Sequence, residues 1–332
     1  MTKVIFLSQK SPPGALVVRA LLCAFALATA DAHAQEYPAR VIKIVAGFPP
    51  GGAVDLLARI TADRLNAKWG QAVVVENRPG AAGNIATEAV SKAEPDGHTL
   101  LLAPPSFVIN PLLYVKLAFD SAAFVPVTTI AGIPNVLMVD PKLAANSVLD
   151  LIALAKANPS TLNYASAGSG GTPHLTAELF KSRAGGLKIT HVPYKGGSTG
   201  PAAVMAGEVQ MMFFNLGGIL PHIRAGKLKV LAVLSEQRIA SLPGVPAMAE
   251  LFPGFVSIAW FGMFAPPKTP MPIAEKLAAA IAEALKQPDV LNRLAGLGAD
   301  PIGNSPSEMA VMLKQETDRW GEVIRAAGVK VE

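Results

Sequence analysis

Glycine-rich turns that follow apolar runs are the parts of this chain whose residue types and spacing could do chemistry. The first reads GFPPGGAVDLLA over residues 47–58 and follows the apolar run 41–46. A strand, a Gly/Pro turn and a helix leave the first backbone N–H groups of the helix unpaired, at the positive end of its macrodipole. Such an arrangement can bind an anion. Similar turns recur along the chain: RPGAAGN (78–84), APPSF (103–107), AGSGGTPH (167–174), YKGGST (194–199) and FNLGG (214–218).

The position of these turns on a sheet decides whether they form a site. Glycine in a single turn needs no ligand to explain it, because its backbone freedom is reason enough. In open α/β sheets, however, ligands bind beyond the carboxyl ends of the strands. Several such turns on that edge therefore predict a cleft lined by backbone donors.

Charged and amide side chains near the turns are expected to support them. Asp55 stands at a helix start, where a carboxylate caps backbone N–H groups. Because two negative charges repel, we expect Asp55 to shape the first loop rather than to touch an anion. Arg59, one turn later, is its expected ion-pair partner. Asn77 and Arg78 are expected to brace the edge of the cleft.

Four histidines lie beyond the N-terminal segment, and we expect them to be isolated from one another. They are His98, His174, His191 and His222, and none has the spacing of a metal site. Three of them are expected to be solvated or structural. Two roles are open for His174, which lies in the first helical turn after a Ser/Gly/Thr loop: donation to a bound anion, or packing against the loop.

The chain lacks the patterns of the common catalytic and cofactor sites. FPPGGAVD (48–55) has no Gly-Lys-Ser/Thr ending, so it is not a nucleotide triphosphate loop. GSGGTPH (168–174) matches a dinucleotide fingerprint only loosely, and no G-x-S-x-G turn, nucleophile–base pair or carboxylate pair is evident. The sequence therefore predicts a binding protein without catalytic residues, cofactor or metal, and a hydrolytic enzyme is the weakest alternative.

The N-terminus has the pattern of a secretory signal. Basic residues precede the apolar stretch 20–30, and the triplet 32–34 has the small-x-small pattern of a signal-peptidase site. The apolar stretch is shorter than the roughly twenty residues that cross a bilayer, so a membrane anchor is disfavoured. We expect residues 1–34 to be removed by cleavage after Ala34 and the mature chain to be secreted. The lone cysteine, Cys23, leaves with the signal, so disulfides are not expected.

Strand and helix patterns alternate along the rest of the chain, which predicts an α/β fold with mostly parallel sheets. Residues 121–139 carry no charge, and we expect a strand, a break near Pro134 and a second strand. This break and another over 235–258 indicate one domain inserted into another. Lobe I would contain 35–133 and 257–332, and lobe II would contain 134–256.

A capping box is expected where Ser147 precedes Asp150 by three residues, at the start of a helix to about Ala157.

Seven segments of the chain, taken in order, resemble those of a known protein family. They are YPARVIKIVAGFPPGGAVDLLARITADRL, VVVENRPGAAGNIATEAV, PDGHTLLLAPPS, SVLDLIALAKANP, LNYASAGSGGTPHLTAELFK, HVPYKGG and RWGEVIRAAG. From about Tyr37 to Val329 the chain resembles the Bug family, the periplasmic solute receptors of tripartite tricarboxylate transporters. The resemblance implies a type II periplasmic-binding-protein (Venus flytrap) fold, whose two lobes close on a small carboxylate.

The resemblance also implies which positions contact the ligand, through backbone amides, hydroxyls and bridging waters. On lobe I they are Phe48, Gly52, Ala53, Pro105 and Ser106. On lobe II they are Ser166, Gly168, Ser169, Thr172, His174, Tyr194, Phe214 and Asn215.

One position departs from that family's pattern. Many relatives read Met-Phe-Asp-Asn where this chain reads Met212-Phe213-Phe214-Asn215. An acidic residue there could pair with a ligand amine, and Phe214 cannot. We therefore expect an aromatic or aliphatic carboxylate, such as a dicarboxylate or tricarboxylate, rather than an amino acid. Phe48 and Phe214 could form an apolar wall of the site, and the alternative is that Phe214 turns into the core.

The favoured function is a receptor that delivers an organic carboxylate to an integral membrane permease, a partner implied by the resemblance alone. A ligand-presenting accessory of a membrane sensor kinase is the alternative. A hinged receptor suits a monomer. The net charge of +5 is spread along the chain without a basic run, so nucleic-acid binding is not expected.

Overall fold

The computed structural model describes residues 37–194 and 199–329. The predicted signal peptide and most of the loop 194–199 lie outside the described residues. Residues from Arg40 onward form one compact unit, which contains every element described below. Within the described ranges, no helix combines the length and the apolar character that a membrane crossing requires.

Strands and helices alternate over most of this unit, as the sequence predicts. The strands are β1 (Ile42–Ala46), β2 (Val73–Asn77), β3 (Thr99–Ala103), β4 (Val125–Val139), β5 (Asn163–Ser166), β6 (Thr190–Pro193), β7 (Met211–Asn215), β8 (Lys229–Val233), β9 (Ile258–Ala265) and β10 (Asp300–Pro301). The α-helices are α2 (Ala53–Trp69), α3 (Asn84–Ser91), α4 (Ser106–Leu113), α5 (Val148–Ala157), α6 (Thr172–Arg183), α7 (Thr199–Ala206), α8 (Leu220–Arg224), α9 (Met271–Ala284), α10 (Pro288–Gly296) and α11 (Pro306–Ala327).

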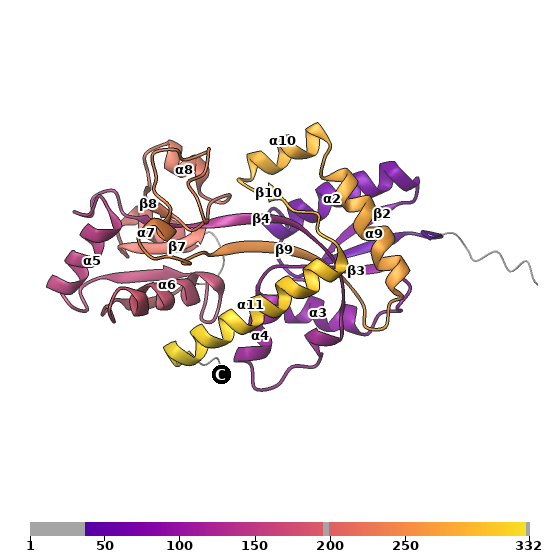
Figure 1. Cartoon of the computed structure of the whole chain (residues 1–332), viewed down its shortest axis with the longest axis horizontal. Helices are drawn as coiled ribbons and strands as arrows, with labels where there is room; N and C mark the ends of the chain where they lie inside the picture. Colours follow the sequence, from indigo (N-terminus) through magenta and orange to yellow (C-terminus); the bar gives the residue numbers. More distant parts are fainter. Residues whose placement is uncertain (1–36, 195–198, 330–332) are drawn as a thin grey trace, which may run out of the picture. The chain divides into compact units, whose positions relative to one another are not determined.

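The strands form a mixed sheet in the order β2-β1-β3-β9-β4-β7-β5-β6, with β8 and β10 also paired to β4 (Figure 1). The expected parallel pairing is present in β2-β1-β3 and in β7-β5-β6. Antiparallel pairs made by β4 and β9 connect these two sets. The carboxyl ends of β1, β2 and β3 therefore meet at one edge, and those of β5, β6 and β7 meet at another.

The predicted break near Pro134 is wrong, because β4 is one continuous strand. Its first part pairs with β9 as far as Pro134, and from Asn135 onward it pairs with β7. The carbonyl of Pro134 accepts the N–H of Leu216, and the N–H of Asn135 goes to the carbonyl of Ser257. Proline lacks one backbone donor, and Pro134 lies where β4 changes partner from β9 to β7, so the pairing on either side of it is kept. The change of partners falls at the predicted boundary 133–134, but the division into two lobes stays a prediction.

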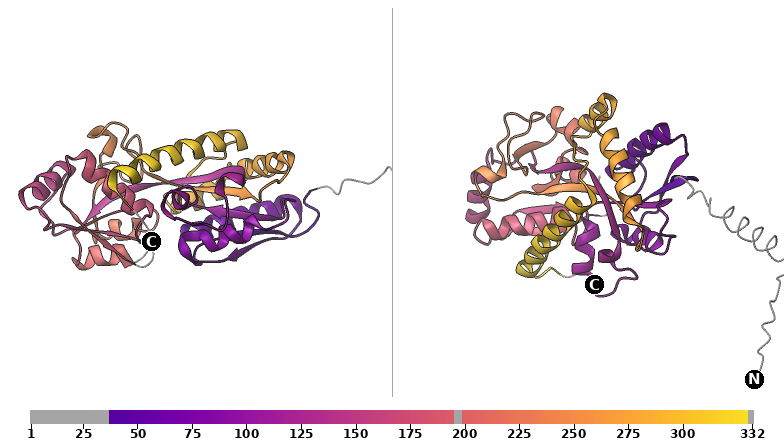
Figure 2. Two further views of the ribbon diagram at one scale, coloured as in Figure 1. Left: turned by 90° about the horizontal axis from the view of Figure 1, so that it is seen from below. Right: turned by 45° about the vertical axis from the view of Figure 1, so that its right-hand side comes forward.

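Two clusters of buried side chains pack against the sheet. One contains Tyr164, Phe180 and Phe213, which lie on or beside the β7-β5-β6 set. The other contains Trp260 of β9 and Trp320 of α11. Helix α11 contacts α4, α6 and β4, and its course along them can be followed in Figure 2. Leu175 of α6 belongs to the second cluster, so α6 is packed directly against α11.

Two helices outside the sheet edges carry serine caps. Ser147 accepts the N–H of Asp150 at the start of α5, which confirms the predicted helix start. The carboxylate of Asp150 also accepts the N–H of Asn146 at 2.9 Å, and hydrogen bonds from Asn146 and Ser147 lower its pKa. Helix α11 begins with a complete capping box between Ser305 and Glu308.

Candidate functional site

The buried carboxylate of Asp55, in the first turn of α2, holds the loop between β1 and α2. Asp55 is only 2% exposed, and its oxygens accept from the Gly51 N–H at 3.0 Å and from Asn77 at 2.9 Å. Arg59 completes the predicted ion pair at 2.9 Å, which is confirmed. Asn77 also donates to the Phe48 carbonyl at 3.1 Å, so it braces the loop as expected. Every oxygen of Asp55 is thus engaged within the protein.

The charge state of Asp55 follows from these bonds. Burial acts to raise the pKa of its carboxyl, but the hydrogen bonds from Arg59, Gly51 and Asn77 outweigh burial and hold the pKa below its ordinary value. The group stays ionised at neutral pH and fixes the backbone of the loop. Arg78 pairs with Glu76 at the end of β2, beside this loop.

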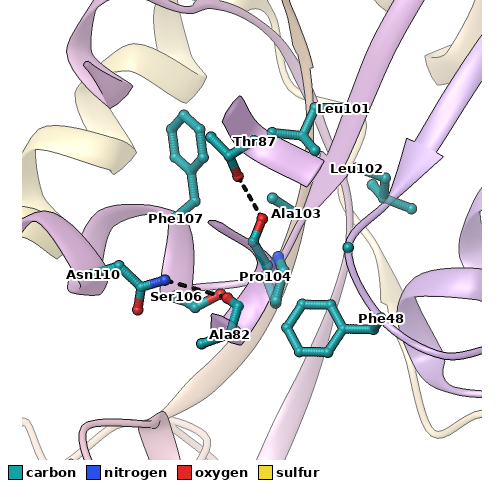
Figure 3. Close-up of a pocket in the computed structure, with 12 residues that line it drawn as sticks. Phe48, Ala82, Thr87, Leu101, Leu102, Ala103, Pro104, Ser106, Phe107 and Asn110 are labelled. Atoms are coloured by element: carbon teal, nitrogen blue, oxygen red, sulfur yellow. Dashed lines mark hydrogen bonds between the residues drawn. The ribbon is translucent and has the colours of Figure 1, made fainter. Parts of the chain in front are cut away.

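A small pocket lies beside this loop, at the edge where β1 and β3 end (Figure 3). It brings together two predicted contact residues, Phe48 and Ser106. Its volume is about 10 Å³, which is about the space that one water molecule requires. The residues that line it are Gly47, Phe48, Ala82, Gly83, Thr87, Leu101, Leu102, Ala103, Pro104, Ser106, Phe107 and Asn110.

The walls of this pocket depend on close backbone approach. A Cβ on Gly47 would lie 2.9 Å from the Cα of Gly83, and Gly83 itself has a φ of +94°. Thr87 donates to the Gly83 carbonyl at 3.0 Å, and Asn110 donates to the Ala82 carbonyl at 3.2 Å, as Figure 3 shows. The sequence singles out the RPGAAGN turn that contains Gly83, but it gives no signal for Asn110, which comes from α4.

Helix starts at these edges lack the side-chain caps of α5 and α11, as do the starts of α8, α9 and α10 elsewhere in the fold. The residues before α2, α3, α4 and α6 are Gly52, Gly83, Pro105 and Gly171, and none of the four helices has a side-chain cap. Glycine and proline have no side chain that could accept from the first helical N–H groups. Two predicted contacts, Gly52 and Ala53, lie at the start of α2. Two others, Pro105 and Ser106, lie at the start of α4, on the same edge formed by β1 and β3.

Hydrogen bonds from the side chains of Ser166 and His174 hold the loop 167–171 between β5 and α6. Ser166 is fully buried, and its hydroxyl donates to the Gly168 carbonyl at 2.9 Å. The same oxygen lies 2.7 Å from Nε2 of His191. Nδ1 of His174 accepts the N–H of Gly170 at 2.9 Å. The ring of His174 therefore packs against its own loop, which is one of the two roles left open for it.

The expectation that the histidines are isolated from one another is wrong for His174 and His191. Their rings stack at 4.0 Å between centroids, with 7° between the ring planes. The contact arises because β5 and β6 are parallel neighbours with Tyr164 opposite His191, while α6 returns across them. Burial lowers the pKa of both rings, and the neighbouring His174 helps to lower that of His191, to about 4.

The contact between Ser166 and His191 has the length of a nucleophile–base pair. Ser166 has no exposed surface, however, and its hydroxyl proton is directed to the Gly168 carbonyl. A base whose pKa is about 4 is also poorly matched to proton abstraction at neutral pH. The contact therefore serves to hold the loop.

The remaining predicted contacts differ in how much of them is exposed. Gly168, Thr172 and Asn215 are partly exposed, and Ser169 is exposed. Tyr194 is partly exposed, and its hydroxyl lies 3.3 Å from Glu208.

Phe214 is buried, with 7% of its surface exposed. It packs against Gly218, where a Cβ would lie 3.2 Å from the Phe214 ring. This position favours the core alternative over an apolar wall of the site. The neighbouring Asn215 accepts the N–H of Gly218 at 3.4 Å. Contact between the ligand and any of these residues stays a prediction.

Metal binding finds no support in the part of the chain that the structure describes, where no three His, Cys, Asp or Glu side chains gather as ligands. The arrangement can hold a small anion through neutral donors.

Comparison with known proteins identifies the family. The family described as "Tripartite tricarboxylate transporter family receptor" matches residues 57–329. A Rhodopseudomonas palustris protein solved with adipate is 37% identical, with a TM-score of 0.81, over 89% of this chain and 99% of that one. The periplasmic binding protein BugD is 31% identical, with a TM-score of 0.78, over 89% of this chain and all of that one.

A third solved structure is MatC from Rhodopseudomonas palustris with bound malate. It is 33% identical, with a TM-score of 0.75, and the match covers 87% of this chain and all of MatC. The expected periplasmic-binding-protein fold and the resemblance to the Bug family are thus confirmed. The chain belongs to the tripartite tricarboxylate transporter receptor family.

Proposed function

We propose that this chain is a periplasmic receptor that binds a small organic carboxylate and delivers it to an integral membrane permease. The observation that carries the proposal is the set of uncapped helix starts, at α2 and α4 beside β1 and β3 and at α6 behind β5. Relatives of similar sequence bind adipate and malate, both of which carry two carboxylates. Membership of a receptor family supports binding without turnover.

Carboxylate recognition in this receptor uses neutral donors. The N–H groups that begin α2, together with the hydroxyl of Ser106, would take one carboxylate. The N–H groups of Ser169, Gly171 and Thr172 would take the other, since those of Gly168 and Gly170 are bound by Ser166 and His174. Each helix start contributes partial positive charge, worth about 0.3–1 kcal/mol at an exposed site. Asp55 keeps the first loop in shape, and its negative charge is paired with Arg59 at 2.9 Å.

The ligand lacks an amine. An ammonium group needs a carboxylate partner when it is desolvated, because an unpaired charge is costly to bury. The buried Phe214 occupies the position where an acidic residue would serve, and its neighbour Asn215 is neutral. We therefore expect aliphatic or aromatic carboxylates to bind and amino acids to be rejected.

Calorimetric titration of the purified mature protein tests the proposal. The ligands are adipate, malate, citrate, nicotinate and terephthalate, with aspartate and glutamate as the amine-bearing pair. At least one amine-free acid should bind with a Kd of about 1 μM or below, equivalent to about −8 kcal/mol. Binding of aspartate or glutamate with such a Kd would contradict the amine argument. Turnover of a bound acid would contradict the receptor itself.

A matched pair of serine variants locates the site. Ser106→Ala should weaken binding of the best acid by about tenfold, because one hydroxyl donor is lost. Ser182→Ala, on the outer part of α6, should leave the affinity unchanged. Equal effects of the two variants would remove the start of α4 from the site.

A further inference from the structure

Two stacked histidines hold the backbone of the loop 167–171. His174 reaches it from α6 through the Gly170 N–H, at 2.9 Å. His191 reaches it from β6 through Ser166, whose oxygen is 2.7 Å from Nε2 and accepts the Gly168 N–H at 3.2 Å. Gly168 and Gly170 both have positive φ, so hydrogen bonds rather than regular structure must define their orientation.

The proton positions follow from counting donors. The single hydroxyl proton of Ser166 goes to the Gly168 carbonyl, so the proton between Ser166 and His191 belongs to Nε2 of His191. His174 accepts at Nδ1, so its own proton is on Nε2, which lies 4.0 Å from a carboxylate oxygen of Glu178. Both rings are neutral in this arrangement.

We propose that His174 and His191 are positioning residues that hold the Gly168 and Gly170 amides and thereby fix the loop 167–171 so that its other N–H groups face a carboxylate, and that protonation of His174 breaks the hydrogen bond from Gly170 and loosens the loop. A proton on Nδ1 turns the acceptor of that hydrogen bond into a donor, so two N–H groups would face each other. The inference rests on the proposed function in one respect only, namely that this loop contacts the ligand.

The charged and polar groups that face His174 and His191 influence the pKa values of the two rings. Glu178 and Lys181 approach from α6, and Tyr164 stacks on His191 from β5. Glu178 is itself bound by the Tyr164 hydroxyl and by Lys181, at 2.5 and 2.7 Å. Burial lowers the pKa of His174, Glu178 acts to raise it and Lys181 acts to lower it further. The pair is therefore neutral at pH 7, and it takes up a proton in acid.

The first measurement follows the loop itself, without any ligand. The mature protein is labelled with ¹⁵N-glycine, and hydrogen exchange of the Gly168 and Gly170 amides is recorded from about pH 8 to about pH 5, the range in which histidine can titrate. The Gly170 amide should lose protection as His174 takes up its proton. His174→Asn places an amide oxygen near the position of Nδ1 and cannot titrate, so its Gly170 amide should stay protected across the range.

Variants at the second histidine separate stacking from hydrogen bonding. His191→Gln keeps a donor near the position of Nε2, and His191→Phe keeps a stacked ring without one. The Gln variant should retain the Gly168 protection of the unmodified protein, and the Phe variant should lose it. Equal Gly168 protection in the two variants would overturn the role of His191.

The second measurement is the affinity for adipate over the same pH range. Because a loosened loop no longer holds its other N–H groups in place, binding should weaken about tenfold in acid relative to His174→Asn, a comparison that cancels the protonation of adipate itself. Parallel affinity curves, or a Gly170 amide whose pH dependence is the same in His174→Asn, would overturn the inference. If the amide behaves as expected while no carboxylate binds at any pH, the proposed function fails and the positioning role stands.

Discussion

At the scale of residues, ionisable side chains near the candidate site hold the backbone of its loops. Asp55 organises the first loop, and the histidine pair organises the second, while the donors left for a ligand are backbone N–H groups and hydroxyls. A carboxylate that accepts several hydrogen bonds inside the protein is expensive to remove, because its donors are left unpaired. The same fact makes Asp55 a sensitive probe of the loop.

Replacing Asp55 with alanine should destabilise the protein by about 2–3 kcal/mol, since the Gly51 N–H and the Asn77 amide lose a buried acceptor. Urea unfolding measures the change. Asp63→Ala is the matched control on the same helix, where Asp63 pairs with Arg293 at 3.0 Å but is largely exposed. Its effect should stay within about 0.5 kcal/mol. A similar loss for both variants would show that Asp55 is an ordinary surface charge.

At the scale of elements, α6 connects the candidate site to the rest of the protein. Its first turn carries His174, and its next residue, Leu175, is packed in the cluster around Trp260 and Trp320. Thr176 is fully buried and lies 2.9 Å from the hydroxyl of Ser257, the residue just before β9. The loop 167–171 is thus attached to a helix that has little freedom to move by itself.

The histidine pair should also make stability depend on pH. The pKa of His191 is about 4 in the folded protein and near 6.5 in an unfolded chain, so between these values the unfolded chain binds more protons. The contribution of this ring is therefore complete above about pH 6.5 and falls as the pH drops towards 4, by at most about 3 kcal/mol, since one pKa unit is worth about 1.4 kcal/mol. Thermal melts of His191→Gln should show a smaller loss over that window. Identical slopes for the two proteins would contradict the assignment.

How much of these elements the sequence predicts depends on how local their causes are. The start of α2 at Ala53 and of α5 after Ser147 are predicted correctly, because turns and caps lie within a few residues of the helix they begin. Helix α4 is not predicted, since Pro111 lies inside it and disguises the helical pattern.

Long-range pairing explains the other differences. The continuity of β4 through Pro134 depends on β7 and β9, which are far away in the sequence. The contact of His174 with His191 likewise depends on the register of β5 with β6. No local pattern contains that register, so the candidate loops could be predicted while the side chains that hold them could not.

At the scale of the molecule, strands from distant parts of the sequence share one sheet, and helices from distant parts pack against one another. β4 pairs with β9 along its first part and with β7 along its second part, and α11 contacts both α4 and α6. A ligand that contacts both sheet edges would favour a closed arrangement only to the extent that it binds this arrangement better. The donors at α2 and α6 are the groups through which such a preference would act.

Periplasmic delivery requires that the chain be exported and processed, which tests the proposed location of the whole protein. Expressed from its full sequence in a Gram-negative host, the protein should appear in the osmotic-shock fraction with Gln35 as its first residue. Ala34→Arg should block this cleavage and leave a longer, membrane-associated precursor, because signal peptidase requires a small residue at that position. Ala30→Val, inside the apolar stretch, is the control and should be processed normally. Recovery of the intact chain from the cytosol would contradict the periplasmic location and therefore delivery to a permease.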